Sequence, residues 1–391
     1  MSEWKEYKLG DLLKIKYGKD HKKLGDGDIP VYGSGGIMRT GDAYLSDKPS
    51  VLIPRKGTLS NIFYVEEPFW TVDTMFWSEI NDNIVIPKYL YYAIKDYKWD
   101  SMNVGSAVPS LTVPVIESVS VSIPSIGTQK KIAAQLSEID DKIAVNRRIC
   151  ENLEAQAQAL FKHWFIDFAP FKGGKFIESE LGMIPEGLVY KKIEEMPHTL
   201  ETGKRPAGGV KGIESGVPSI GAENIKGLGC YDYSKTKFVT EEYAASMKKG
   251  KISGYELLIY KDGGKPGYFI PNFAIFGEGY PYNEMCLNEH VFKLDFSNKG
   301  YSLFAYFFFK TKQIMSYLNA QGSKAAIPGI NSKDIDAIMM PSLENECVKN
   351  YCNEVEDIIT QILILSKESA HLSTLRDTLL PRLMSGEISI C

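Results

Sequence analysis

Two long stretches of the chain place apolar residues at alternating spacings of four and three. The first runs from residue 128 to residue 168 and contains no proline. Its seam positions are Ile132, Leu136, Ile139, Ile143, Asn146, Cys150, Leu153, Ala157, Leu160 and Trp164. This heptad pattern predicts a helix of about 38 residues, which would be about 57 Å long. No isolated domain core needs a helix of that length, so we expect this one to pair with another helix.

A second seam lies near the end of the chain and slips in phase near Leu365, which changes the supercoil locally. Its positions are Val348, Cys352, Val355, Ile359, Ile362, Leu365, Leu372, Leu375, Leu379 and Leu383. We expect the two helices to pair in antiparallel orientation. The pairing seam is expected to contain Leu136, Ile139, Ile143, Asn146, Leu153, Leu160, Val355, Ile359, Ile362, Leu372 and Leu379. Asn146 would be a buried polar residue that fixes the register. The alternative is that each helix packs on its own domain.

The segments before the two seams alternate short β-rich runs with glycine, proline and aspartate. They also repeat each other about 217 residues apart, since the run that begins at Gly105 has a counterpart from Gly322 to Asn331. We therefore expect an α+β chain with two mixed α/β domains, joined by two long antiparallel coiled-coil helices in an internal pseudo-twofold repeat. The expected segments are a first domain 1–126, a helix 127–168, a connector 169–185, a second domain 186–343 and a helix 344–388.

The bulk composition limits the possible functions without selecting one. The chain has 391 residues, 44% of them hydrophobic and 24% charged, which is ordinary for a globular protein of two or three domains. No apolar run approaches the ~18 residues of a membrane span, and the first residues lack a secretory pattern, so we expect a cytoplasmic protein.

The charge balance shows that any nucleic-acid binding must depend on local clusters. The net charge is −4. Residues 1–125 carry 14 basic and 16 acidic side chains, and residues 186–342 carry 19 and 17. Neither half has the overall positive field that would bind a nucleic acid non-specifically.

The sequence lacks the motifs of nucleic-acid methyltransferases and of nucleotide-binding enzymes. An Asn/Asp-Pro-Pro-Tyr/Phe loop and a Walker loop are absent, and the cluster from Gly33 to Gly36 does not have the dinucleotide-binding spacing. The six cysteines and five histidines are scattered without metal-ligand spacing. We therefore expect no catalytic residue, no metal site and no cofactor site in this chain.

Ordered sets of short runs occur in both halves of the chain. The first half contains Trp4-Lys5, Leu9-Gly10-Asp11, Ile29-Pro30-Val31-Tyr32-Gly33, Ile53-Pro54-Arg55-Lys56-Gly57, Gln129-Lys130-Lys131-Ile132 and Ala159 to Phe168. The second half contains Thr202-Gly203-Lys204-Arg205-Pro206, Val217-Pro218-Ser219-Ile220-Gly221 and Leu379 to Ile388. No single run is specific, but the set covers nearly the whole chain. In this order, the runs resemble the specificity subunits of type I restriction-modification systems.

The resemblance implies a non-catalytic subunit of a restriction and adenine-methyltransferase complex. Each target-recognition domain would read one half of a bipartite, gapped sequence in double-stranded DNA. The helices would act as a spacer and would dock two methyltransferase (M) subunits, which restriction (R) subunits join in the full complex. S-adenosylmethionine, ATP and Mg would be bound by those partners rather than by this chain.

Basic residues in glycine-rich loops are the candidates for DNA contact. They are Lys19, Lys22, Lys23, Arg39, Arg55, Lys56, Lys204, Arg205, Lys261 and Lys265. Arginine can make bidentate contacts with guanine, so Arg55 and Arg205 are favoured for base reading and the lysines for phosphate contact. The alternative for each residue is an exposed loop charge without a special role.

Two other functions compete with DNA reading. A duplicated scaffold for protein–protein interaction would also explain the balanced charge of the two domains. A fused modification-and-cleavage enzyme is disfavoured, because the methyltransferase motifs are missing. Salt-dependent affinity for duplex DNA would distinguish the first of these from a specificity subunit.

Overall fold

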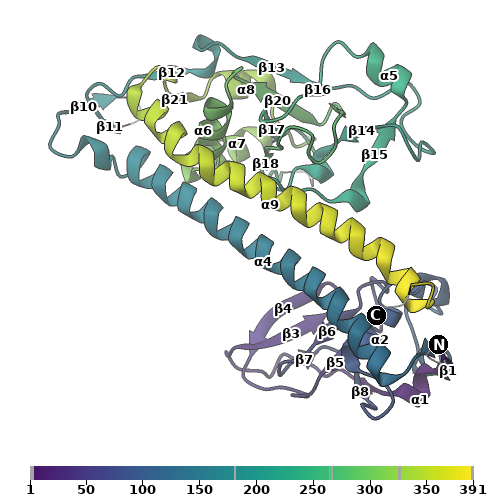
Figure 1. Cartoon of the computed structure of the whole chain (residues 1–391). Coiled ribbons are helices and arrows are strands. Elements are labelled where there is room, and N and C mark those ends of the chain that lie inside the picture. Colours follow the sequence, from purple (N-terminus) through teal and green to yellow (C-terminus); the bar gives the residue numbers. More distant parts are fainter. Residues whose placement is uncertain (1–3, 180–181, 264, 266, 325–326, 389–391) are drawn as a thin grey trace. The chain divides into compact units, whose positions relative to one another are not determined.

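A computed structural model describes residues 4–179, 182–263, 265, 267–324 and 327–388 (Figure 1). Residues 325 and 326 of the repeated run therefore lie outside the described residues. The chain divides into two compact units. Unit 1 comprises residues 1–142 and 372–391, and unit 2 comprises residues 143–371. The division falls within both long helices, α4 (Ile126–Phe165) and α9 (Glu346–Met384).

Unit 1 contains two main sheets and a small strand pair. The four-stranded sheet has the order β2 (Leu13–Tyr17), β8 (Met75–Ile80), β5 (Ser50–Pro54) and β6 (Phe63–Val65). The three-stranded sheet has the order β4 (Gly36–Gly41), β3 (Ile29–Gly33) and β7 (Trp70–Thr71), while β1 (Lys5–Lys8) pairs with β9 (Ser120–Ile123). Its short helices are α1 (Leu9–Leu12), α2 (Pro87–Ile94) and α3 (Val113–Glu117).

Unit 2 is built from a related set of strands. One sheet has the order β13 (Thr199–Thr202), β20 (Val291–Asp295), β17 (Leu257–Tyr260) and β18 (Phe273–Ala274). The other has the order β15 (Lys237–Val239), β14 (Val217–Ile220), β19 (Met285–Leu287) and β16 (Lys251–Ile252). Two pairs complete the strands, β12 (Tyr190–Lys192) with β21 (Met339–Pro341) and β10 (Phe176–Ser179) with β11 (Gly182–Pro185). The remaining helices are α5 (Glu241–Ser246), α6 (Lys299–Phe309), α7 (Lys312–Gly322) and α8 (Ser332–Asp336).

The two units share the order of their strands. In the four-stranded sheets, β2-β8-β5-β6 of unit 1 corresponds to β13-β20-β17-β18 of unit 2. In the second sheets, β3 runs parallel to β7, and β14 runs parallel to β19. The pair β1 and β9 corresponds to β12 and β21. The mixed α/β character predicted from the sequence is therefore present in each unit, and residues at the same places in the two topologies can be compared.

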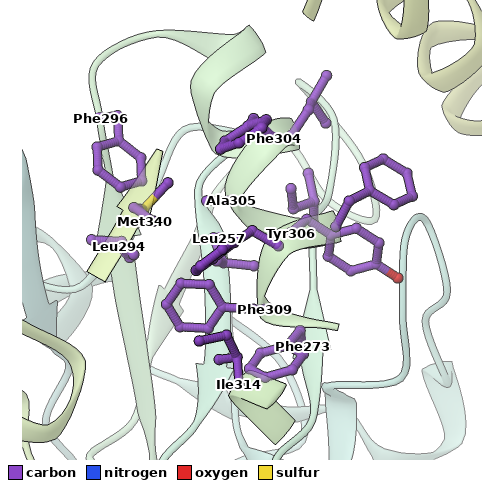
Figure 2. Close-up of a cluster of buried hydrophobic side chains, with 14 of the residues drawn as sticks. Leu257, Phe273, Leu294, Phe296, Phe304, Ala305, Tyr306, Phe309, Ile314 and Met340 are labelled. Carbon is purple, nitrogen blue, oxygen red and sulfur yellow. The ribbon is translucent and has the colours of Figure 1, made fainter. Parts of the chain in front are cut away.

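The hydrophobic core of unit 2 forms around α6, which is buried on nearly every side from Ser302 to Phe309. Figure 2 shows α6 side chains lying against the sheet and the neighbouring helices. The labelled cluster comprises Leu257, Phe273, Leu294, Phe296, Phe304, Ala305, Tyr306, Phe309, Ile314 and Met340. A helix that is apolar all round needs cover on all sides, and here the sheet and the long helices provide it.

Both long helices predicted from the heptad pattern are present. Pro381 lies inside α9, and the helix continues for three more residues to Met384. The carbonyl of Pro381 still accepts the N–H of Ser385 at 3.0 Å, so the last turn closes although proline itself cannot donate. Among the described residues, no helix is both long enough and apolar enough to cross a membrane.

Within unit 2, α4 and α9 contact each other in antiparallel orientation. As residue numbers rise along α4, those of the partners on α9 fall. The contacts join Asn146 Nδ2 to Glu368 Oε2 at 2.7 Å, Cys150 Sγ to the Ile362 carbonyl at 3.6 Å, and Tyr351 Oη to the Ala157 carbonyl at 3.1 Å. Asn146 is fully buried, as the seam predicts, and its Nδ2 rather than its Oδ1 makes the interhelical bond.

The burial of the seam differs from the sequence pattern near the end of α4. Leu136, Asn146, Val355, Ile359 and Ile362 are buried, whereas Ile139, Ile143, Leu153, Leu160, Leu372 and Leu379 are half-buried. After Ala157 the most buried positions of α4 are Phe161 and Phe165, one residue beyond the predicted Leu160 and Trp164. The face shifts because these two rings pack against Phe304 of α6 as well as Tyr351 of α9.

A half-buried ion pair joins α4 to α9 within unit 1. Arg376 Nη1 lies 2.7 Å from Asp140 Oδ1, and the hydroxyl of Tyr92 donates to Asp140 Oδ2 at 2.7 Å. Replacing Arg376 with alanine leaves the Asp140 carboxylate without its cation, so we expect unfolding of unit 1 to become easier by about 1–3 kcal/mol. Urea unfolding followed by circular dichroism would measure this loss. Arg382→Ala, which removes a more exposed pair with Glu387, should change stability much less, and equal losses would contradict the prediction.

Candidate nucleic-acid interface

Loops and strand ends of unit 1 surround a cavity of about 610 Å³. The cavity is lined by Asp20, His21, Lys22, Gly33, Ser34, Gly35, Met38, Val72, Asp73 and Thr74. These residues come from the loop after β2, from the end of β3 through the turn into β4, and from the turn between β7 and β8. The loop with three of the predicted lysines and the turn after β7 therefore meet at one place.

Four backbone hydrogen bonds fix the loop that follows β5, and one of them runs from the Lys56 N–H to the Thr74 carbonyl at 3.2 Å. Arg55 donates its N–H to the Thr74 carbonyl at 2.8 Å, and the Arg55 carbonyl accepts from Leu111 at 2.9 Å. Gly57 donates to the Pro109 carbonyl at 3.0 Å. The β5 loop is thus held between the turn after β7 and the segment before α3. We call these three bonded segments the loop frame of unit 1.

The side chains of Arg55 and Lys56 have different environments in this frame. Arg55 Nη1 donates to the Asp73 carbonyl at 3.1 Å, and its guanidinium lies 5.5 Å from the ring centre of Tyr17. Lys56 is exposed. Arg55 is therefore held in one orientation. Its guanidinium has five N–H groups, so further donors are available to a ligand. Lys56 extends from the same loop.

The other predicted residues of unit 1 divide into exposed and internally bonded ones. Lys19, Lys22 and Lys23 are exposed on the loop after β2. Arg39 donates to the carbonyls of Leu24, Gly25 and Thr40, at 3.2, 3.1 and 2.9 Å. We call the loop after β2 that carries these three lysines the lysine-bearing loop. The hydrogen bonds of Arg39 hold the end of this loop in position.

Unit 2 builds the same loop frame with different side chains. Lys261 donates its N–H to the His290 carbonyl at 3.0 Å, and its own carbonyl accepts from Ile330 at 2.8 Å. Gly263 donates to the Pro328 carbonyl at 2.9 Å. The correspondence is Arg55 with Lys261, Lys56 with Asp262, Gly57 with Gly263, Asp73 with Glu289, Thr74 with His290, and Leu111 with Ile330. The side-chain contact also repeats, since Lys261 Nζ donates to the Glu289 carbonyl at 3.1 Å.

Ion pairs occupy the loop frame of unit 2. Arg205 Nε lies 3.3 Å from Glu289 Oε1, and His290 lies between two carboxylates, with Nδ1 bonded to Asp262 Oδ1 and Nε2 3.3 Å from Glu289 Oε1. Burial, and then the charge of Asp262, raise the pKa of Tyr260 above its ordinary value. Lys204 and Lys265 are exposed. Arg205, favoured for base reading, is thus partly neutralised here.

Asp262 and His290 were not among the residues selected from the sequence. A search for basic side chains passes over an aspartate, and His290 has no metal-ligand spacing. A signal was present in the sequence, because Lys261-Asp262-Gly263 follows β17 as Arg55-Lys56-Gly57 follows β5, which aligns Asp262 with Lys56. No group of three or more His, Cys, Asp or Glu side chains in the described part of the chain is placed to hold a metal ion.

The chain is similar in sequence to proteins of known function. Residues 1–155 match the family model described as the type I restriction modification DNA specificity domain. The chain is 26% identical to the type I restriction enzyme MjaIX specificity subunit of Methanocaldococcus jannaschii, over 88% of this chain and 78% of that protein. It is 25% identical to the type I restriction enzyme HindI specificity subunit of Haemophilus influenzae, over 99% and 100%.

A solved structure has the same fold. The crystal structure of a type I restriction-modification system S subunit from M. genitalium aligns with a TM-score of 0.59 at 15% identity, covering 98% of this chain and 96% of that chain. The family model and the two relatives confirm the resemblance drawn from the sequence, to type I specificity subunits. The comparisons support the predicted function of a DNA sequence-specificity subunit and do not favour the protein–protein scaffold.

Proposed function

We propose that this chain is the non-catalytic subunit that gives a type I restriction-modification enzyme its DNA specificity. Each loop frame would contact one half of a bipartite, gapped target in double-stranded DNA. The observation that carries this proposal is the duplicated frame, which holds Arg55 and Lys261 by the same backbone bonds and the same side-chain contact. A protein that reads two half-sites needs such a scaffold twice, with different side chains on each copy.

The proposed mechanism is direct reading of base edges. The four base pairs differ most clearly in the major groove, and half or more of protein–DNA hydrogen bonds go to the backbone and only position the protein. Arg55 would contact a guanine, and Arg205 would do so after release from Glu289. Lys19, Lys22, Lys23, Lys56, Lys204 and Lys265 would contact phosphates, and Arg39 and Lys261 would hold their loops in place.

The partners and cofactors belong to the same proposal. Residues 1–126 and 186–343 would be the two target-recognition domains, and the helices at 127–168 and 344–388 would form an antiparallel coiled coil in a pseudo-twofold arrangement, with 169–185 as connector. Two methyltransferase subunits would dock on these helices, and restriction subunits would join them in the cytoplasm. S-adenosylmethionine, ATP and Mg would be bound by the partners. The contacts between α4 and α9 inside each unit support this arrangement.

Mapping N6-methyladenine across the host genome by long-read sequencing, with this gene intact and disrupted, tests the proposal. We expect one bipartite, gapped motif to lose its methylation when the gene is disrupted. Restoring the gene on a plasmid is the control and should restore that motif. An unchanged methylome in a strain whose methyltransferase is expressed would count against the specificity role.

Replacing Arg55 with alanine should weaken recognition of one half-site and leave the other readable. The loss of one good bidentate contact is about 1–3 kcal/mol. Binding of the complex with its methyltransferase to duplexes altered in one half-site at a time would measure it. Lys48→Ala removes an exposed charge of unit 1 that lies outside the frame and is the matched control. Equal weakening at both half-sites, or none, would contradict the role of Arg55.

A further inference from the structure

The two loop frames differ in charge at the residue before a left-handed glycine. Lys56 precedes Gly57, whose φ is 96°, and Asp262 precedes Gly263, whose φ is 132°. Lys56 bridges to Ser110 and Asp262 bridges to Gly329, so each is held in an antiparallel pairing at the same point of its frame. One scaffold position therefore presents an ammonium in unit 1 and a carboxylate in unit 2.

We propose that Asp262 determines specificity by accepting a hydrogen bond from the exocyclic N4 amino group of a cytosine in the half-site contacted by unit 2. His290 is its positioning residue. This inference rests on the proposed function, since it names the base that one of the two loop frames recognises.

The contacts of Asp262 leave one of its oxygen atoms available. Oδ1 is bonded to His290 Nδ1, whereas Oδ2 lies 3.6 Å from Lys261 Nζ, which is longer than a normal hydrogen bond. His290 is held in turn by its backbone N–H, which donates to Asn288 Oδ1 at 2.9 Å, and by Nε2 near Glu289. The carboxylate is thus fixed in orientation through one oxygen while the other keeps free lone pairs. With 26% of its side chain exposed, Asp262 remains accessible.

The chemistry of base edges selects cytosine for a carboxylate. Cytosine presents the N4 donor in the major groove without an adjacent acceptor. Adenine presents its N6 donor beside the N7 acceptor, which a carboxylate cannot satisfy, and guanine presents two acceptors. An ionised aspartate facing guanine or thymine would meet only acceptors or apolar groups.

The surrounding cations make a carboxylate tolerable near DNA. Phosphates repel an aspartate, and this cost must be offset by nearby positive charge or by a donor on the base. Lys261 lies beside Asp262, and Lys204 and Lys265 are exposed on loops of the same unit. If Asp262 served only to hold His290, its removal would weaken binding to every sequence alike. A base-reading role predicts weakening that depends on one base.

Base analogues in the full complex with the methyltransferase provide the test. Each cytosine of the target is replaced in turn by pyrimidin-2-one, which lacks the N4 amino group, and affinity is measured by fluorescence anisotropy competition. The wild-type complex should lose about 5- to 100-fold at one cytosine of the half-site that does not respond to Arg55→Ala. The Asp262→Ala complex should bind the unmodified target more weakly than wild type does. In this variant, the analogue at that cytosine should lower affinity no more than the analogue does at the other cytosines.

A second variant tests the same residue without emptying its position. The substitution Asp262→Asn keeps the side-chain volume but, with its carbonyl oxygen bonded to His290, places an amide donor where the free carboxylate oxygen was. The preference for cytosine should therefore be lost at that one position. Glu284→Ala, which removes another exposed carboxylate of unit 2, is the matched control and should leave the preference unchanged. An Asp262→Asn complex with unaltered preference, or equal analogue losses in wild type and Asp262→Ala, would overturn the inference. Absence of any sequence preference in the wild-type complex would instead overturn the proposed function.

Discussion

Replacing Ile359 with aspartate is expected to unfold unit 2. The side chain is fully buried on α9 within the core that also contains Tyr351, Val355 and Ile362. An unpaired carboxylate at such a position costs about 3–5 kcal/mol, which is a large part of the stability of a typical domain. Thermal unfolding followed by circular dichroism, together with the yield of soluble protein, would measure the loss.

The same helix supplies the control for this substitution. Ile364 lies five residues further along α9 and is 56% exposed. Ile364→Asp introduces the same charge into solvent, so stability should change by less than about 0.5 kcal/mol. The Ile359→Asp loss should also shrink as the pH falls, because burial disfavours the charged form and raises the pKa of the new carboxyl. A similar loss for both variants would mean that α9 is not packed through this face.

Replacing Gly18 with alanine should displace the lysine-bearing loop of unit 1 and abolish recognition of one half-site. A Cβ at this position would lie 2.0 Å from the Val72 carbonyl oxygen and 2.7 Å from that of Thr71. Backbone atoms cannot give way as a flexible side chain can, so the end of β2 must move away from β7. We expect a stability loss of about 1–3 kcal/mol from the overpacking, together with the loss of the base contacts that the frame positions.

A second glycine of unit 1 separates loop displacement from a general effect of substitution. Gly35 lines the cavity beside the lysine-bearing loop, but a Cβ there meets no atom within 4 Å. Gly35→Ala should therefore leave both stability and half-site preference unchanged. Gly203 occupies the place of Gly18 in unit 2, where a Cβ would lie 1.6 Å from the Leu287 carbonyl oxygen. Gly203→Ala should impair the other half-site, and methylome sequencing of the two variants would show whether each affects a different half.

The largest features of this protein were determined by the sequence alone. Heptad spacing depends only on which residues are apolar, so it predicted both long helices and the burial of Asn146. The repeat at 217 residues predicted two similar domains, and the four-stranded sheets of the two units have corresponding strand orders.

The pairing of side chains from distant segments was decided only by the tertiary structure. Arg205 meets Glu289, and Asp262 meets His290, across 84 and 28 residues of sequence, and no local pattern encodes such contacts. The buried face of α4 moves to Phe161 and Phe165 because α6 adds a second surface that a two-helix pattern does not contain. Local periodicity fixes which residues are apolar along one element. The side chains that pack around that element, and the charges that they neutralise, come from distant segments of the sequence. Only folding brings those segments together.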